Sequence, residues 1–84
     1  MYSVYFAKSL KNGKVYVGFT IKKPEIRVVE HNNDSNTWSK HNKPLKLIYY
    51  EEYICKEDAE KRENFFKTGI GKKIKKAIIE CLDP

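Results

Sequence analysis

Apolar and polar residues alternate in two short stretches near the N-terminus. Residues 2–10 read YSVYFAKSL, and residues 14–20 read KVYVGFT. A period of two is typical of a β-strand that buries one face. The pair Asn12-Gly13 lies between the two stretches and is a strong short-range signal for a β-hairpin. We therefore predict two antiparallel strands joined by a two-residue turn.

The hairpin has two chemically different faces. With a two-residue turn, Lys11 faces Lys14 and Tyr5 faces Thr20, and facing residues share a side of the sheet. One side is then a candidate core, made of Val4, Phe6, Val15, Val17 and Phe19. The other side combines hydroxyls with small residues and leaves room for something to approach the sheet: Ser3, Tyr5, Ala7, Ser9, Tyr16, Gly18 and Thr20. Plain cross-strand packing of the two tyrosines is the alternative.

The rest of the chain alternates between helical patterns and one further strand. Pro24 is tolerated in a first helical turn, and Gly69 is expected to stop a helix. The predicted elements are a helix over 25–32, a loop over 32–43, a strand over 45–54, a helix over 56–68 and a last helix over about 71–81. The order β-β-α-β-α-α predicts an α+β fold, a small three-stranded antiparallel sheet flanked by helices. We expect a single domain over residues 1–84.

The net charge indicates which classes of partner the chain is expected to bind. The net charge is +6 and the sequence pI is about 9.3, which favours polyanions, with nucleic acid first and an anionic membrane surface second. A soluble basic domain without a special partner is the alternative. The chain has no run of roughly 18 apolar residues, so no membrane span is predicted. The N-terminus lacks the pattern of a signal peptide, so an intracellular, cytoplasmic protein is expected.

Two cysteines, Cys55 and Cys81, fit no metal-binding spacing. We expect them to be free, partly buried thiols.

Two helical segments carry candidate chemistry. Arg27 and His31 are spaced i, i+4 and share a helix face, outside the apolar arc of Ile26, Val28 and Val29. Glu63 interrupts a stripe made of Ala59 and Phe66. A buried carboxylate needs a partner, so Glu63 either forms a structural ion pair or holds a metal.

These residues together resemble a known family. The segments Ser3-Val4-Tyr5 and Tyr16-Val17-Gly18, then Arg27 and His31, then Glu63 within KRENFF, are similar to the motifs of the GIY-YIG nuclease domain. EHN at 30–32, LIYYEE at 47–52 and TGIGKK at 68–73 resemble its small stand-alone members. The similarity covers nearly the whole chain. It departs from the family at Ser3, where the family has glycine, and after Thr68, where a late asparagine has no clear counterpart.

The resemblance implies a divalent-metal-dependent DNA endonuclease that acts in DNA repair or recombination. The implied site consists of Tyr5, Tyr16, Arg27, His31 and Glu63. Glu63 would hold Mg²⁺ or Mn²⁺, for which its hard oxygens are suited. Arg27 would bind phosphate, and Tyr16 with His31 would activate water. Flanking phosphates would be bound by Lys14, Lys72 and Lys73.

Two alternatives stay open at this stage. A non-catalytic nucleic-acid-binding module would keep the fold and the basic surface, and the missing asparagine favours it. A protein-interaction domain, whose charge only confers solubility, is the third reading. The aligned carboxylate of Glu63 favours the nuclease, because binding alone does not require it.

Overall fold

The computed structural model describes residues 1–33 and 41–82. Its elements in chain order are β1 (Tyr2–Ser9), β2 (Val15–Thr20), α1 (Pro24–Asn33), β3 (Leu45–Tyr53), α3 (Lys56–Phe66) and α4 (Gly69–Leu82). The predicted α+β class and the order β-β-α-β-α-α are confirmed. Residues 34–40, which make up most of the predicted loop, lie outside the described residues.

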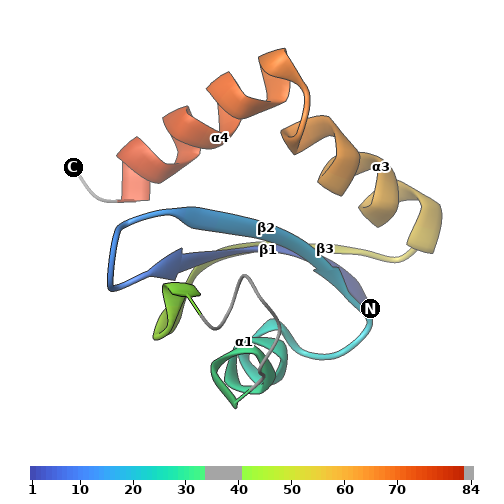
Figure 1. The fold of residues 1–84 in the computed structure, drawn as a ribbon. Coiled ribbons are helices and arrows are strands. Elements are labelled where there is room, and N and C mark those ends of the chain that lie inside the picture. Colours follow the sequence, from blue (N-terminus) through green and yellow to red (C-terminus); the bar gives the residue numbers. More distant parts are fainter. Residues whose placement is uncertain (34–40, 83–84) are drawn as a thin grey trace.

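The three strands form one antiparallel sheet in the order β2-β1-β3. Helix α1 lies on one face of the sheet, and α3 and α4 lie on the other (Figure 1). The central strand β1 is therefore covered on both sides, and five successive residues of it, 3–7, are buried. No helix in the described ranges is long and apolar enough to cross a bilayer.

The hairpin has a different register from the predicted one. Tyr5 pairs with Gly18 instead of Thr20, because the strands are joined by residues 10–13. A two-residue type I′ turn would require positive φ at both central residues, and Gly13 (φ 77°) has it whereas Asn12 does not. The register is displaced by two residues, and an even displacement keeps each side chain on its face. The prediction of the two faces is therefore confirmed, although that of the turn is wrong.

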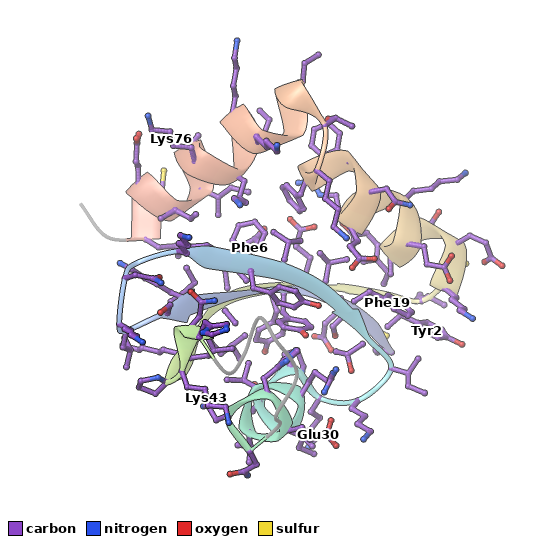
Figure 2. The ribbon with its side chains drawn as sticks, viewed as in Figure 1. Tyr2, Phe6, Phe19, Glu30, Lys43 and Lys76 are labelled. Atoms are coloured by element: carbon purple, nitrogen blue, oxygen red, sulfur yellow. The ribbon has the colours of Figure 1, made fainter. Side chains whose placement is uncertain are left out.

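The side of the sheet under α3 and α4 holds the larger core. Val4, Phe6 and Val17 pack there with Ala59 and Phe66 of α3. The rings of Phe6 and Phe66 meet edge to face at 5.0 Å, and Figure 2 shows Phe6 between the sheet and these helices. A β-bulge interrupts the pairing of β3 with β1 between Phe6 and Ala7. It allows two successive residues, Ile48 and Tyr49, to pack against this same core.

Helix α1 buries only Val28 of the apolar arc that its sequence suggested. Ile26 is 50% exposed and Val29 is 58% exposed. Pro24 and His31 are buried beside Val28. The sheet face beneath α1 presents tyrosines, and one of them gives the imidazole a hydrogen-bond partner. The helix therefore turns a mixed polar face inward.

The junction of the last two helices also differs from the prediction. Helix α3 ends at Phe66, and Gly69 is the first residue of α4. Thr68 links the helices, since its Oγ1 donates to the Phe65 carbonyl at 2.7 Å and accepts from the Gly71 amide at 3.0 Å. The Thr68 hydroxyl thus caps the start of α4, and Gly69, which was expected to stop the preceding helix, begins the next one.

Helix α4 packs on the sheet through fewer apolar residues than its periodicity suggested. Ile78 and Ile79 pack against the core. Ile74 and Leu82 are 41% and 48% exposed. Cys55 and Cys81 are free, as predicted, but both are exposed, so the expectation of partial burial is wrong.

Candidate active site

A hydrogen bond joins the first motif tyrosine to helix α1. The Tyr5 hydroxyl lies 2.8 Å from His31 Nε2, and both residues are almost completely buried, at 1% and 3% exposure. Burial raises the pKa of Tyr5 above its ordinary value. Tyr5 therefore stays protonated across the physiological range, and its hydroxyl serves as a fixed hydrogen-bonding group.

The second motif tyrosine completes an aromatic cluster with these two residues. The Tyr16 ring lies 6.1 Å from the ring of Tyr5 and meets the ring of His31 edge-on at 5.1 Å. Tyr16 is half-buried, whereas Tyr5 is closed off from solvent. His31 is thus hydrogen-bonded to Tyr5 and in ring contact with Tyr16. The two tyrosines therefore pack against each other across the strands, and both also contact His31.

Gly18 makes room for this cluster. A Cβ at this position would overlap the hydroxyl end of Tyr5 and would approach Tyr16 Cε1 to 2.8 Å. The Tyr5 ring therefore lies directly across the glycine. This explains in steric terms why a glycine follows Tyr16-Val17 on a strand where its flexibility is otherwise unfavourable.

Arg27 and Glu63 belong to the same electrostatic environment. Arg27 lowers the pKa of Tyr5, while Tyr16, Glu63 and Glu30 add to the increase that burial causes. The charges of Arg27 and Glu63 therefore both act on Tyr5, whose direct contacts are with His31 and Tyr16.

Glu63 reaches this environment from the other layer of the fold. It lies on α3, which packs on the sheet face opposite α1 and contacts the edge strand β2. Its side chain is 21% exposed and lies 3.5 Å from Lys67, one turn further along the helix. The structural ion pair considered for Glu63 is therefore present, but it is long, and its lysine is 59% exposed.

The predicted phosphate-binding lysines are exposed. Lys14 lies at the hairpin, and Lys72 and Lys73 lie on α4, in the layer opposite α1. A lysine that the sequence reading did not single out, Lys75, extends from α4 to the Val15 carbonyl at 3.5 Å. Burial and then the charge of Lys72 lower the pKa of Lys75. A basic strip thus follows α4 beside β2.

The sequence reading also missed the partners of Arg27. Arg27 Nη1 donates to Glu30 Oε1 at 3.2 Å, and Lys22 Nζ donates to Glu30 Oε2 at 2.5 Å. The spacing of Arg27 and Glu30, i and i+3 on one helix, was a usable signal. The contribution of Lys22 was not visible, because it comes from the turn after β2.

A basic α+β scaffold that carries two tyrosines, an imidazole, a guanidinium and a carboxylate on its strands and helices is of the class that the sequence resemblance implies, a nuclease domain. Comparison with known proteins agrees. The family model of the GIY-YIG catalytic domain matches residues 1–76, and the chain belongs to this family. The family is one of nucleases, and it implies nucleic acid as the class of substrate.

The similar curated proteins are of the same size as this chain. A UPF0213 protein of Staphylococcus saprophyticus is 36% identical over 78 residues, which cover 92% of this chain and 93% of that protein. A UPF0213 protein of Staphylococcus epidermidis is 38% identical over 66 residues, which cover 77% of this chain and 78% of that protein. No solved structure matches the chain.

Proposed function

We propose that this chain hydrolyses phosphodiester bonds in DNA as a metal-dependent endonuclease. The observation that carries the proposal is the meeting of motif residues from β1, β2 and α1 at Tyr5. His31 is hydrogen-bonded to it, Tyr16 is in ring contact, and the charges of Arg27 and Glu63 affect its ionisation. Phosphodiester cleavage requires an activated water and stabilisation of charge on the phosphate, and these side chains offer both.

The two tyrosines have different roles in this proposal. Burial keeps Tyr5 protonated, and its hydrogen bond with His31 Nε2 fixes the orientation of the imidazole. The half-buried Tyr16 is the phenol that can meet a water molecule, and in its phenolate form it takes the proton of that water. Arg27 offers a planar, permanently charged fork to the phosphate oxygens.

Glu63 suits a divalent cation that keeps most of its water. Members of the family generally use divalent metals. In the described ranges no group of three or more His, Cys, Asp or Glu side chains forms a ligand cluster. A partly exposed carboxylate with one displaceable lysine partner fits Mg²⁺ or Mn²⁺, which accept few protein ligands and complete their shell with water and substrate oxygens. When bound, such an ion would neutralise charge on the phosphate and the leaving oxygen.

A nicking assay on supercoiled plasmid tests the proposal. Wild-type protein with Mg²⁺ or Mn²⁺ is expected to convert the plasmid to the open-circular form, and chelation is expected to stop the conversion. Glu63→Gln should reduce the rate by about 100-fold or more, because metal stabilisation of the transition state amounts to several kcal/mol. Glu60→Gln is the matched control, since Glu60 lies on the same helix in an exposed pair with Lys56.

Equal rates for the Glu63→Gln and Glu60→Gln proteins would contradict the proposal. Retention of duplex binding without any nicking by the wild type would favour the non-catalytic binding module instead. Loss of that binding as salt rises would then separate the module from a protein-interaction domain.

A further inference from the structure

An open pocket lies beside the tyrosine cluster and contains three charged side chains. Its volume is about 400 Å³, and it is lined by Phe19, Thr20, Ile21, Lys22, Arg27 and Glu30. These residues come from the end of β2, the turn after it and the outer part of α1. Figure 2 shows Glu30 on the α1 side of the molecule, away from α3 and α4. The pocket therefore adjoins the candidate site through Arg27.

A single carboxylate joins both cations of this pocket. Glu30 accepts from Arg27 Nη1 with one oxygen and from Lys22 Nζ with the other. The hydrogen bond of Lys22 and its charge, followed by those of Arg27, hold the pKa of Glu30 below its ordinary value. Glu30 lies near the C-terminal end of α1, where the helix dipole disfavours an acid. The ion pairs with Lys22 and Arg27 therefore offset the unfavourable effect of the helix dipole on the Glu30 carboxylate.

The carboxylate occupies this position without being buried in it. The side chains of Lys22, Glu30 and Arg27 are 53%, 36% and 32% exposed. Ion pairs with this degree of exposure contribute little to stability and are readily exchanged. The backbone below them is better fixed, because the Lys22 amide donates to the Oγ1 of the buried Thr20 at 2.9 Å.

Resting on the proposed function, we propose that Lys22 and Arg27 form a backbone-phosphate subsite of the DNA-binding surface, and that Glu30 is its internal counter-ion, displaced when the phosphate binds. A phosphate offers the same pair of acceptor oxygens as the carboxylate to a guanidinium fork and an ammonium. Without DNA, Glu30 holds both cations in place. With DNA, Arg27 faces the phosphate, and Lys22 binds it from the β2 side.

Binding of a short fluorescent duplex, measured by anisotropy in EDTA, tests this assignment without any cleavage. Glu30→Gln should bind more tightly than the wild type, because the phosphate no longer competes with a carboxylate. The binding constant of Glu30→Gln should fall more steeply with salt than that of the wild type, by the slope that about one additional phosphate contact contributes. Its advantage over the wild type should then shrink about three- to four-fold between about 50 and about 200 mM salt. Glu25→Gln is the matched control, since it makes the same charge change at an exposed position of the same helix.

The position of Lys22 is tested by combining substitutions. If Lys22 contacts the phosphate, Lys22→Gln should weaken binding about three-fold or more even in the Glu30→Gln protein. If Lys22 merely neutralises Glu30, the Lys22→Gln change has no effect in that background, and the subsite is refuted. Equal binding and equal salt slopes for Glu30→Gln and Glu25→Gln also refute it, as does the absence of duplex binding by every variant.

The assay separates this inference from the proposed endonuclease. If the protein nicks plasmid in a Glu63-dependent way but Glu30→Gln binds DNA as Glu25→Gln does, the endonuclease proposal stands and the subsite is refuted. If the variants show the expected binding pattern but the wild type never nicks, the subsite stands and the endonuclease proposal is refuted. Circular dichroism of each variant checks that the fold is unchanged.

Discussion

The Glu51 carboxylate attaches α3 to the sheet, and its removal should be costly. Tyr49 and Tyr53 donate to it at 2.5 and 2.7 Å, and Arg62 donates through Nε and Nη2 at 2.9 and 3.2 Å. Arg62 also lies over the ring of Phe66, 4.4 Å from its centroid. Arg62 directly precedes the candidate metal ligand, so this network fixes the helix that carries it.

The size of the effect follows from the contacts. In Glu51→Gln one acceptor oxygen remains, and at least one charge-assisted hydrogen bond of about 1.5–3 kcal/mol is lost. Glu51 is 15% exposed, but Arg62 is 31% exposed, so water can solvate part of the unpaired guanidinium. We therefore expect about 2 kcal/mol of destabilisation, which lowers the melting temperature by about 8–16 °C in a domain of this size.

The pH dependence gives a second, independent readout. Burial acts to raise the pKa of Glu51, but the hydrogen bonds from Arg62, Tyr49 and Tyr53 hold it below the ordinary value. The stabilisation is therefore fully present above the unfolded-state pKa of about 4.3 and is lost as the pH falls through the lower folded-state pKa. The stability difference between wild type and Glu51→Gln should be constant near neutral pH and should shrink in acid.

Urea unfolding followed by circular dichroism measures both effects. The control is Glu52→Gln, because Glu52 is the exposed neighbour on the same strand and should change stability by no more than about 0.5 kcal/mol. If Glu51→Gln were as stable as Glu52→Gln at neutral pH, or if its deficit persisted undiminished in acid, the network would not stabilise the fold as reasoned here.

Two further substitutions test the support of the site. Gly18→Ala should destabilise the protein by about 1–3 kcal/mol and impair nicking, because its Cβ would overlap the Tyr5 side chain; unchanged urea unfolding and activity would contradict this. Asn32→Ala should cost about 2 kcal/mol, at about 1 kcal/mol per hydrogen bond. The Asn32 amide bonds both the N–H and the carbonyl of Leu45 at 2.7 and 3.0 Å, and equal unfolding midpoints for variant and wild type would refute that role.

The division of the hairpin into two faces could be predicted from the sequence, but its turn could not. Alternation depends only on the period of the strand, so it survives the change in register. The turn depends on a partner far along the chain, since the Ser9 hydroxyl donates to the Asn42 carbonyl at 2.7 Å and the Asn12 amide donates to Asn42 Oδ1 at 2.6 Å. The local Asn-Gly signal contains no information about Asn42.

The face that helix α1 packs against the sheet could not be predicted from the sequence of the helix alone. Its sequence offers two candidate inner faces, an apolar arc of Ile26, Val28 and Val29 and a polar face with Arg27 and His31. Hydrophobicity alone selects the apolar arc, yet only Val28 of that arc is buried. The choice is made by the sheet, where the buried Tyr5 hydroxyl needs a hydrogen-bond partner and His31 provides it. The resemblance to a nuclease family found this face because its motif residues mark the site, whereas hydrophobic periodicity marks only apolar surface.

The charges around Tyr5 connect the proposed subsite to the proposed chemistry. Glu30 raises the pKa of Tyr5, and Arg27 lowers it. A phosphate that displaces Glu30 from Arg27 substitutes one anion for another beside the same guanidinium, so DNA binding gives the Tyr5 hydroxyl no reason to ionise. Tyr5 therefore remains protonated and hydrogen-bonded to His31 before and after the substrate binds. In the proposed chemistry the base is then Tyr16 in its phenolate form, because Tyr16 is the tyrosine that is not closed off from solvent.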